Sequence, residues 1–211
     1  MRILVFLIIL VILFPLVFFN IINVSFGKLG LSLEATALLL LLTFIGSMIN
    51  IPISRQQINS QQKRRLYSYF FFYLPPQVTR QVIMINVGGA VIPVVFSLYL
   101  MFRTPILPTL LATIIVTVVN KVFARLVSGE GIIAPFWIST VFSAGLALIL
   151  ARSDPGPVAY ISGAMGTLIG ADLLNWQNYK KLGSQIISIG GFGVYDAIFM
   201  SGIVAVLITS L

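Results

Sequence analysis

The stretch ILVFLIILVILFPLVFF fills residues 3–19 and holds no charged, amide or hydroxyl side chain. A helix needs about 20 mostly apolar residues to cross a bilayer, so this stretch predicts a membrane span over residues 3–22. The run is too long for the apolar part of a secretory signal peptide, and no A-x-A cleavage site follows it. We therefore expect the segment to be retained as a span.

The composition of the whole chain agrees with a membrane protein. Of its 211 residues 59% are hydrophobic and 9% are charged, whereas soluble domains carry roughly 25% charged residues. The net charge of +8 is spread between apolar runs, so we expect no nucleic-acid partner. The chain has no Cys and no His, which excludes disulfides, thiolate metal sites and catalysis by either side chain. We expect no metal and no cofactor, and any chemistry must use carboxylates, amides, hydroxyls or the backbone.

Six more apolar stretches predict spans, at residues 34–53, 82–102, 106–122, 132–151, 157–176 and 188–210. Seven spans leave no room for a soluble domain of normal size. The sequence therefore predicts an all-α bundle, a single transmembrane domain over residues 1–211. Its expected location is the cell membrane, as a multi-pass protein with lipid around it.

The basic residues predict the orientation. With the N-terminus inside, only Lys28, Arg103 and Arg152 of the 13 Lys and Arg lie on the outer side. This bias predicts an N-in, C-out topology. The one long connection, residues 54–80, is basic in its first half and aromatic in its second. It suits either a segment at the lipid headgroups or a plain loop whose charges set topology.

Two aspartates, Asp172 and Asp196, fall inside the sixth and seventh predicted spans. A charged Asp at the centre of a span costs about 2.5–3.5 kcal/mol on insertion scales, so each marks a candidate functional site. Asp172 lies only four residues before Trp176, so a solvated helix-end carboxylate is an open alternative for it. Asp196 lies about eight residues into its span and is harder to explain structurally.

Glycines precede the second aspartate in the sequence SIGGFGVYD, residues 188–196. Gly190, Gly191 and Gly193 each weaken a helix by about 1 kcal/mol, so the entry to this span is expected to be non-helical. Irregular backbone at membrane depth needs protein cover or a water-filled cavity, which predicts a cavity beside Asp196.

The sixth predicted span is rich in small residues. Ser162, Gly166 and Gly170 recur every four residues, as in helices that touch backbone to backbone. We expect this packing to bring Asp172 close to the seventh span. Asn175 follows Asp172 by three residues on nearly the same face and is a candidate hydrogen-bond partner for it.

Paired carboxylates allow two kinds of chemistry. When two carboxyl groups lie about 3–5 Å apart they share one proton. The charged partner activates a water, and the protonated partner donates to a carbonyl oxygen. The same pair is equally suited to binding and releasing a proton or cation in a transporter or channel. A non-catalytic scaffold subunit, whose aspartates pair with another chain, is a third possibility.

At GADLLN (residues 170–175) and GGFGVYDAIF (residues 190–199) the chain resembles a family of small multispan prokaryotic membrane proteins listed as a domain of unknown function. The two aspartates are also similar to those of the intramembrane aspartyl proteases: presenilin, signal peptide peptidase and preflagellin peptidase. This likeness matches Asp172 to the first catalytic aspartate of those proteases. It matches Gly191, Gly193 and Asp196 to their glycine–aspartate motif.

The leading hypothesis is an intramembrane aspartyl protease with Asp172 and Asp196 as its catalytic pair. Its expected substrate is a membrane-embedded helix or signal-peptide remnant, cut near the cytoplasmic face. The expected supporting residues are Gly190, Gly191, Gly193, Tyr195 and Asn175.

Overall fold

The computed structural model describes residues 2–57, 80–127, 131–175, 178, 186–191 and 194–210. The chain is mostly helical. Its helices are α1 (Arg2–Lys28), α2 (Leu33–Ser47), α3 (Ile92–Met101), α4 (Ile106–Phe123), α5 (Phe136–Leu150), α6 (Pro155–Thr167) and α7 (Tyr195–Ser210). Two π-helical turns, η2 (Val87–Val91) and η3 (Leu168–Asp172), lead into α3 and continue α6. The strands are β1 (Asn50–Gln57), β2 (Arg80–Asn86), β3 (Arg125–Val127), β4 (Gly131–Ile133) and β5 (Ile186–Ile189).

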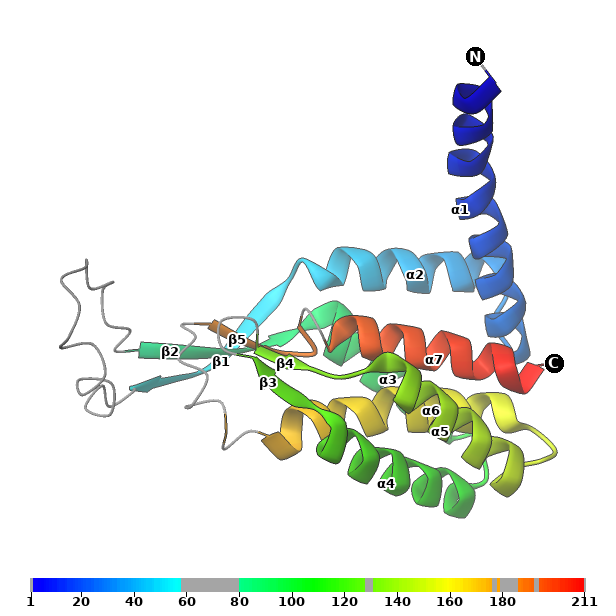
Figure 1. The fold of residues 1–211 in the computed structure, drawn as a ribbon. Coiled ribbons are helices and arrows are strands. Elements are labelled where there is room, and N and C mark those ends of the chain that lie inside the picture. The colour runs from blue at the N-terminus through cyan, green and yellow to red at the C-terminus, as the bar shows by residue number, and fades with distance from the viewer. Residues whose placement is uncertain are drawn as a thin grey trace, which may run out of the picture.

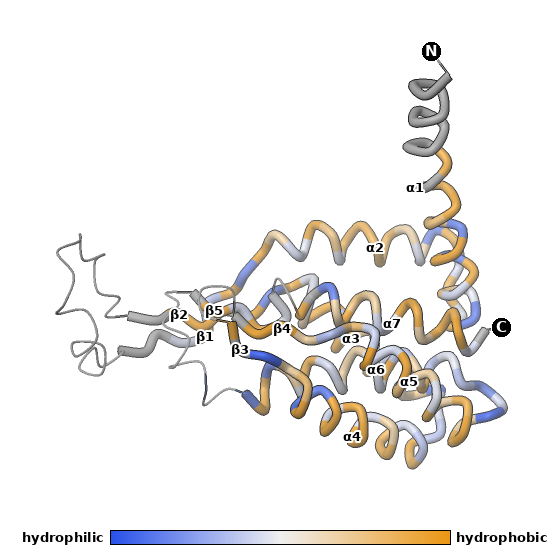
Figure 2. Tube along the Cα trace, in the orientation of Figure 1, coloured by the Kyte–Doolittle hydropathy of each residue, from blue (hydrophilic) through white to orange (hydrophobic). Residues whose placement is uncertain are grey.

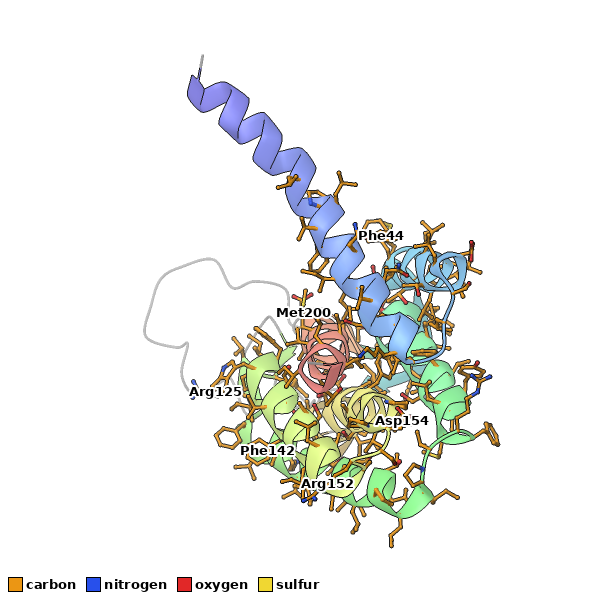
Figure 3. The ribbon with its side chains drawn as sticks, turned by 90° about the vertical axis from the view of Figure 1, so that its right-hand side faces the viewer. Phe44, Arg125, Phe142, Arg152, Asp154 and Met200 are labelled. Atoms are coloured by element: carbon orange, nitrogen blue, oxygen red, sulfur yellow. The ribbon has the colours of Figure 1, made fainter. Side chains whose placement is uncertain are left out.

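Helices α2 to α7 run back and forth along one direction, and all the strands gather at one end of them (Figure 1). We call this the sheet end. Viewed along the helices from the opposite end, α6 and α7 lie at the centre, with the other helices around them (Figure 3). Helix α1 runs across this direction, and its segment 15–28 makes an angle of 111° with α2. Its C-terminal part is anchored by Phe26, which stacks on Phe96 at 5.9 Å and meets the Tyr160 ring edge-on at 6.0 Å.

The strands were not expected from the sequence. β1 pairs with β2 in antiparallel fashion, and β2 pairs with β5 in parallel, from Val82↔Ile186 to Ile85↔Ile189. The predicted spans 34–53, 82–102 and 188–210 are therefore each helical over only part of their length. Short apolar runs rich in β-branched residues, such as IISI, do not distinguish strand from helix by periodicity. The strands occupy both ends of the long connection 54–80, and its residues 58–79 lie outside the described part.

The small residues of α6 bring neighbouring helices close. A Cβ on Gly166 would lie 2.7 Å from Val116 Cγ1, and one on Gly170 would lie 2.8 Å from Asn120 Cβ, both on α4. Gly163 instead lies between α5 and α7, since a Cβ there would be 3.2 Å from Ser143 Oγ and 3.4 Å from the carbonyl group of Ser201. The row Gly166–Gly170 thus packs against α4, whereas Gly163 packs against α5 and α7.

Helix α4 has an inverted distribution of polarity. Its buried face carries Thr109, Ala112, Val116 and Asn120. Its outer face is aliphatic, with exposed fractions of 68% for Leu107, 59% for Ile114, 56% for Val118 and 71% for Val122. Apolar residues, in orange, make up most of α4 in Figure 2. This arrangement is the reverse of a helix on the surface of a water-soluble domain.

Within the described residues, two helices are long and apolar enough to cross a membrane, Ile106–Phe123 and Pro155–Asn175. The count rises to three if segments 15–28 and Leu33–Ser47 form one bent span. The structure thus supports the helical class but neither seven full-length spans nor the N-in, C-out topology. At the sheet end, the shorter helices are limited by strands. Helix α2 is followed by β1, and α3, α5 and α7 come after β2, β4 and β5.

Candidate functional site

Asp172 is buried at the sheet end, where it closes the π-helical turn η3. Only 2% of the residue is exposed. Its Oδ2 accepts a hydrogen bond of 2.6 Å from the backbone N–H of Gly190, in the turn after β5. A carboxylate that accepts from a buried N–H forms one of the stronger classes of protein hydrogen bond. The carboxylate therefore holds the glycine-rich segment against the end of α6.

The turn requires glycine at residues 190 and 191, because a side chain has no room at either position and Gly190 has a positive φ. Gly190 has φ of +66°, which most L-residues avoid. A Cβ there would lie 2.6 Å from the carbonyl carbon of Gly89. A Cβ on Gly191 would lie 2.6 Å from Ser188 Cβ. The predicted break in the helix is confirmed, and α7 begins only at Tyr195. Gly193 and the side chain of Tyr195 lie outside the described residues.

A second strand–glycine–helix junction lies beside the first. Here β2 leads through Asn86, Gly88 and Gly89 into η2 and α3. Asn86 Oδ1 accepts from the Gly89 N–H at 2.7 Å, and its Nδ2 donates to Ser47 O of α2 at 2.7 Å. Sequence reasoning overlooked this junction, although the signal was present as a second Gly-Gly pair after an apolar run.

A polar cluster joins the three strands. Asn50 Oδ1 accepts hydrogen bonds from Asn86 Nδ2 at 3.2 Å and from Ser188 Oγ at 2.5 Å. Asn50 and Asn86 also face each other in the β1–β2 ladder. These side chains link β1, β2 and β5 directly beside the two glycine pairs, so they fix the start of α3 and the turn that leads to α7.

Asn175 lies one turn beyond Asp172, is 4% exposed, and has partners other than the expected one. Its Nδ2 donates to Ala171 O at 2.7 Å, and its Oδ1 accepts from Lys121 Nζ of α4 at 2.7 Å. Lys121 Nζ also donates to Leu174 O. The Asn175 amide therefore ties the end of the helix to α4 and does not serve mainly as a partner of Asp172.

Asp196 has a different environment from Asp172. It is exposed and lies in the first turn of α7. The predicted span began at residue 188, and in the structure the end of β5 and the turn at Gly190 precede the helix, so Asp196 lies at the start of α7. A carboxylate in the first turn of a helix is stabilised by the helix dipole. The two carboxylates lie on neighbouring elements at the sheet end, one buried and the other exposed.

The cavity described beside α7 is apolar. Its volume is about 10 Å³, roughly the minimum that holds one water. Phe199 and Ile203 of α7 line it together with residues of α1, α2, α3 and α6, and Asp196 is not among them. This cavity is therefore not the one predicted beside Asp196. Across the same part of the chain, no three His, Cys, Asp or Glu side chains come together to hold a metal.

Chemically, the sheet end offers a buried carboxylate, an exposed carboxylate one glycine turn away, and an extended strand between them in sequence. These groups are suited to proton transfer.

The comparisons with known proteins assign no activity to them. No curated protein and no solved structure matches the chain, so the likeness to aspartyl proteases rests on the motif residues alone. One family model, described as "Protein of unknown function (DUF1614)", matches residues 44–208 and includes both aspartates and both glycine junctions. The chain therefore belongs to the DUF1614 family.

Proposed function

We propose that this protein is embedded in a lipid bilayer and that its seven apolar segments all enter the membrane. The inverted polarity of α4 supports this proposal, because large exposed aliphatic side chains need an apolar solvent. Helices of 15 residues, such as α2 and α5, reach only about 22 Å. They suit short spans that thin the bilayer locally or continue into interfacial strands.

The basic residues suggest which end is cytoplasmic. Lys121 and Arg125 lie at the sheet end, near the end of α4 and in β3. Arg103 and Arg152 follow α3 and α5 at the opposite end, where Figure 3 labels Arg152. In the proposed orientation the sheet end faces the cytoplasm, in keeping with the positive-inside rule.

We further propose that the protein is an intramembrane aspartyl protease that uses Asp172 and Asp196. The observation that carries this proposal is the hydrogen bond from Gly190 N–H to Asp172 Oδ2. It ties the carboxylate at the end of η3 to the segment that leads into Asp196. Both carboxylates are thereby kept at one end of the bundle, next to the parallel strand β5.

In the proposed reaction, one carboxylate takes a proton from water while the water oxygen attacks the scissile carbonyl carbon. The other, protonated carboxyl group donates its proton to the carbonyl oxygen. The tetrahedral diol then collapses, the C–N bond breaks, and the leaving nitrogen takes up a proton. Because Asp196 is exposed while Asp172 is buried, substrate binding must bring the two carboxylates together across one water.

Transport through the bundle has less support. Several buried hydroxyl groups of α4 and α6 bond to the carbonyl four residues earlier, as Thr109 does to Pro105 O and Ser162 to Val158 O, whereas the Thr167 hydroxyl has no partner. Such bonds satisfy the hydroxyl groups without lining a water-filled path. This pattern favours a role for Asp172 and Asp196 at the sheet end over a role in a continuous pathway.

The test is cleavage of labelled single-span peptides by the purified protein in lipid vesicles. Wild type should cut near one end of the peptide, whereas Asp172→Asn and Asp196→Asn should each lose essentially all activity while remaining folded. Asp154→Asn is the matched control, since Asp154 is exposed at the opposite end of the bundle and its variant should cut like wild type. Retention of full cleavage by either active-site variant would reject the catalytic pair.

A further inference from the structure

The Asp172 carboxylate lies at the C-terminal end of its helix, where the helix dipole disfavours a negative charge. Helix α6, η3 and the following turn together extend over residues Pro155–Asn175. The C-terminal end of such a helix has partial negative charge, because its last carbonyl groups lack partners within the helix. Asp172 adds a carboxylate to this end and is only 2% exposed. A positive group that binds the open carbonyl groups of this helix end offsets part of the unfavourable interaction.

Lys121 of α4 supplies a positive charge at this helix end. Its ammonium group donates to Leu174 O and to Asn175 Oδ1, the latter at 2.7 Å. These two acceptors come two and three residues after Asp172 in the chain. The ammonium therefore lies on the same helical end as the carboxylate and satisfies a carbonyl oxygen that the helix leaves open.

The attachment of Lys121 is built into the packing of α4 against η3. A Cβ on Gly170 would lie 3.1 Å from the Lys121 backbone nitrogen, so the two backbones touch here. The preceding residue, Asn120, is 1% exposed and its Oδ1 accepts from Ser139 Oγ of α5 at 2.7 Å. The backbone of Lys121 is thus held against η3 and its neighbour Asn120 is held by α5. A lysine that only sets membrane topology needs no such contacts.

We propose that Lys121 is a positioning residue for Asp172. It holds the last turn of the α6–η3 helix through Leu174 and Asn175, and thereby fixes the position of the Asp172 carboxylate in the same turn. This inference rests on the proposed function where it concerns catalysis. It also makes a claim about the helix end that can be measured without any cleavage.

The experiment compares Lys121→Met, Lys121→Arg and wild type in lipid vesicles, with Arg125→Met as the control. Arg125 is exposed at the same end of the bundle, so its variant removes the same charge from a solvent-exposed side chain. Three readouts are taken: amide hydrogen exchange over residues 168–175, amide exchange at Gly190, whose N–H donates to Asp172 Oδ2, and the kcat and KM of peptide cleavage.

Lys121→Met should speed amide exchange in the last helical turn by about tenfold, the equivalent of one lost charge-assisted hydrogen bond. Exchange at the Gly190 amide should become faster too, because its acceptor Asp172 is no longer held in place. The kcat should fall by about tenfold with KM unchanged. Lys121→Arg should restore each readout to near wild type, and Arg125→Met should leave all three unchanged.

Unchanged exchange at residues 168–175 and at Gly190 in Lys121→Met would overturn the proposal. So would faster exchange at the helix end with an unchanged Gly190 amide, or a change in KM with kcat unchanged, because either result describes a lysine that does not position Asp172. If wild type cleaves no peptide, the proposed function fails, and the two exchange measurements still decide the role of Lys121.

Discussion

The two strand–glycine–helix junctions at the sheet end differ in how their glycine turns are held. At the β2–α3 junction, the Gly89 N–H is capped by Asn86, which belongs to the adjoining strand. At the β5–α7 junction, the Gly190 N–H is capped by Asp172, which lies on another helix and is 18 residues away in sequence. The first junction is closed by a local neutral amide, and the second depends on a distant ionisable group.

This difference shows which junction is suited to chemistry. A neutral cap keeps the same hydrogen bond at every ordinary pH, because an amide side chain does not titrate. A carboxylate cap responds to protonation and to the charges around it. The junction that leads to Asp196 is therefore the adjustable one, and its neighbour is the fixed support against which it packs.

The largest effects are expected where the two junctions touch each other and α2. Gly190→Ala would place a Cβ against Gly89 at a positive φ, and Gly88→Ala would place one against Thr43 and Ser47 of α2. Overpacking against backbone atoms should destabilise each variant by about 3 kcal/mol or more, and the positive φ adds strain to Gly190→Ala. Unfolding in detergent measures the loss. If both variants unfold at the wild-type midpoint, then Gly190 does not lie against Gly89 and Gly88 does not lie against α2.

Removal of the local cap should have the next largest effect. Asn86→Ala loses the bonds to Gly89 N, Ser47 O and Asn50 Oδ1 and leaves buried partners unsatisfied. We expect a loss of about 2–3 kcal/mol in the free energy of unfolding. Because an amide does not titrate, the loss should be equal at pH 5 and pH 8. A strong dependence on pH would contradict the distinction between the junctions.

Removal of the distant cap should have a somewhat smaller effect on stability. Asp172→Ala leaves the Gly190 N–H without its acceptor, which should destabilise the protein by about 1.5–3 kcal/mol. Asp172→Asn keeps an oxygen that can accept this bond, so it should recover about half of the loss. Amide exchange at Gly190 follows the bond directly. Equal protection of this amide in wild type and Asp172→Ala would remove the assigned role of the carboxylate.

The smallest effect is expected at a glycine outside both junctions. Gly145 lies within α5, and nothing comes within 4 Å of its Cβ position. Gly145→Ala should stabilise the protein by about 0.5–1 kcal/mol, because alanine favours helix more than glycine does. This variant is the reference for the junction glycines. Destabilisation here would mean that glycine substitutions act through general helix packing and not through the two turns.

Much of the helical part was predictable from the sequence. The predicted span 106–122 and the helix Ile106–Phe123 nearly coincide, because a long unbroken apolar segment strongly indicates a helix. The non-helical entry to α7 was also predicted from Gly190 and Gly191. The strands β2 and β5 were not predicted, because short runs with three β-branched residues each, VIMI and IISI, fit either structure until a partner strand is available.

The candidate site shows the same division. The sequence singled out Asp172 and Asp196 as acidic residues in apolar surroundings, and it singled out the glycines between them. It placed Asp196 about eight residues into its span, whereas in the structure α7 begins only one residue before Asp196. Lys121 was counted only as an inner charge, because nothing local indicates that its ammonium group reaches Asn175.

Composition and apolar run length by themselves determined that this chain is a helical protein with apolar outer surfaces, because these properties are summed over segments and do not depend on partners. Tertiary structure alone decided that two strands meet in parallel, that Gly190 lies against Gly89, and that Asp172 accepts the Gly190 N–H. Those features are contacts between segments far apart in the chain, and their energies arise only when the backbones have come together.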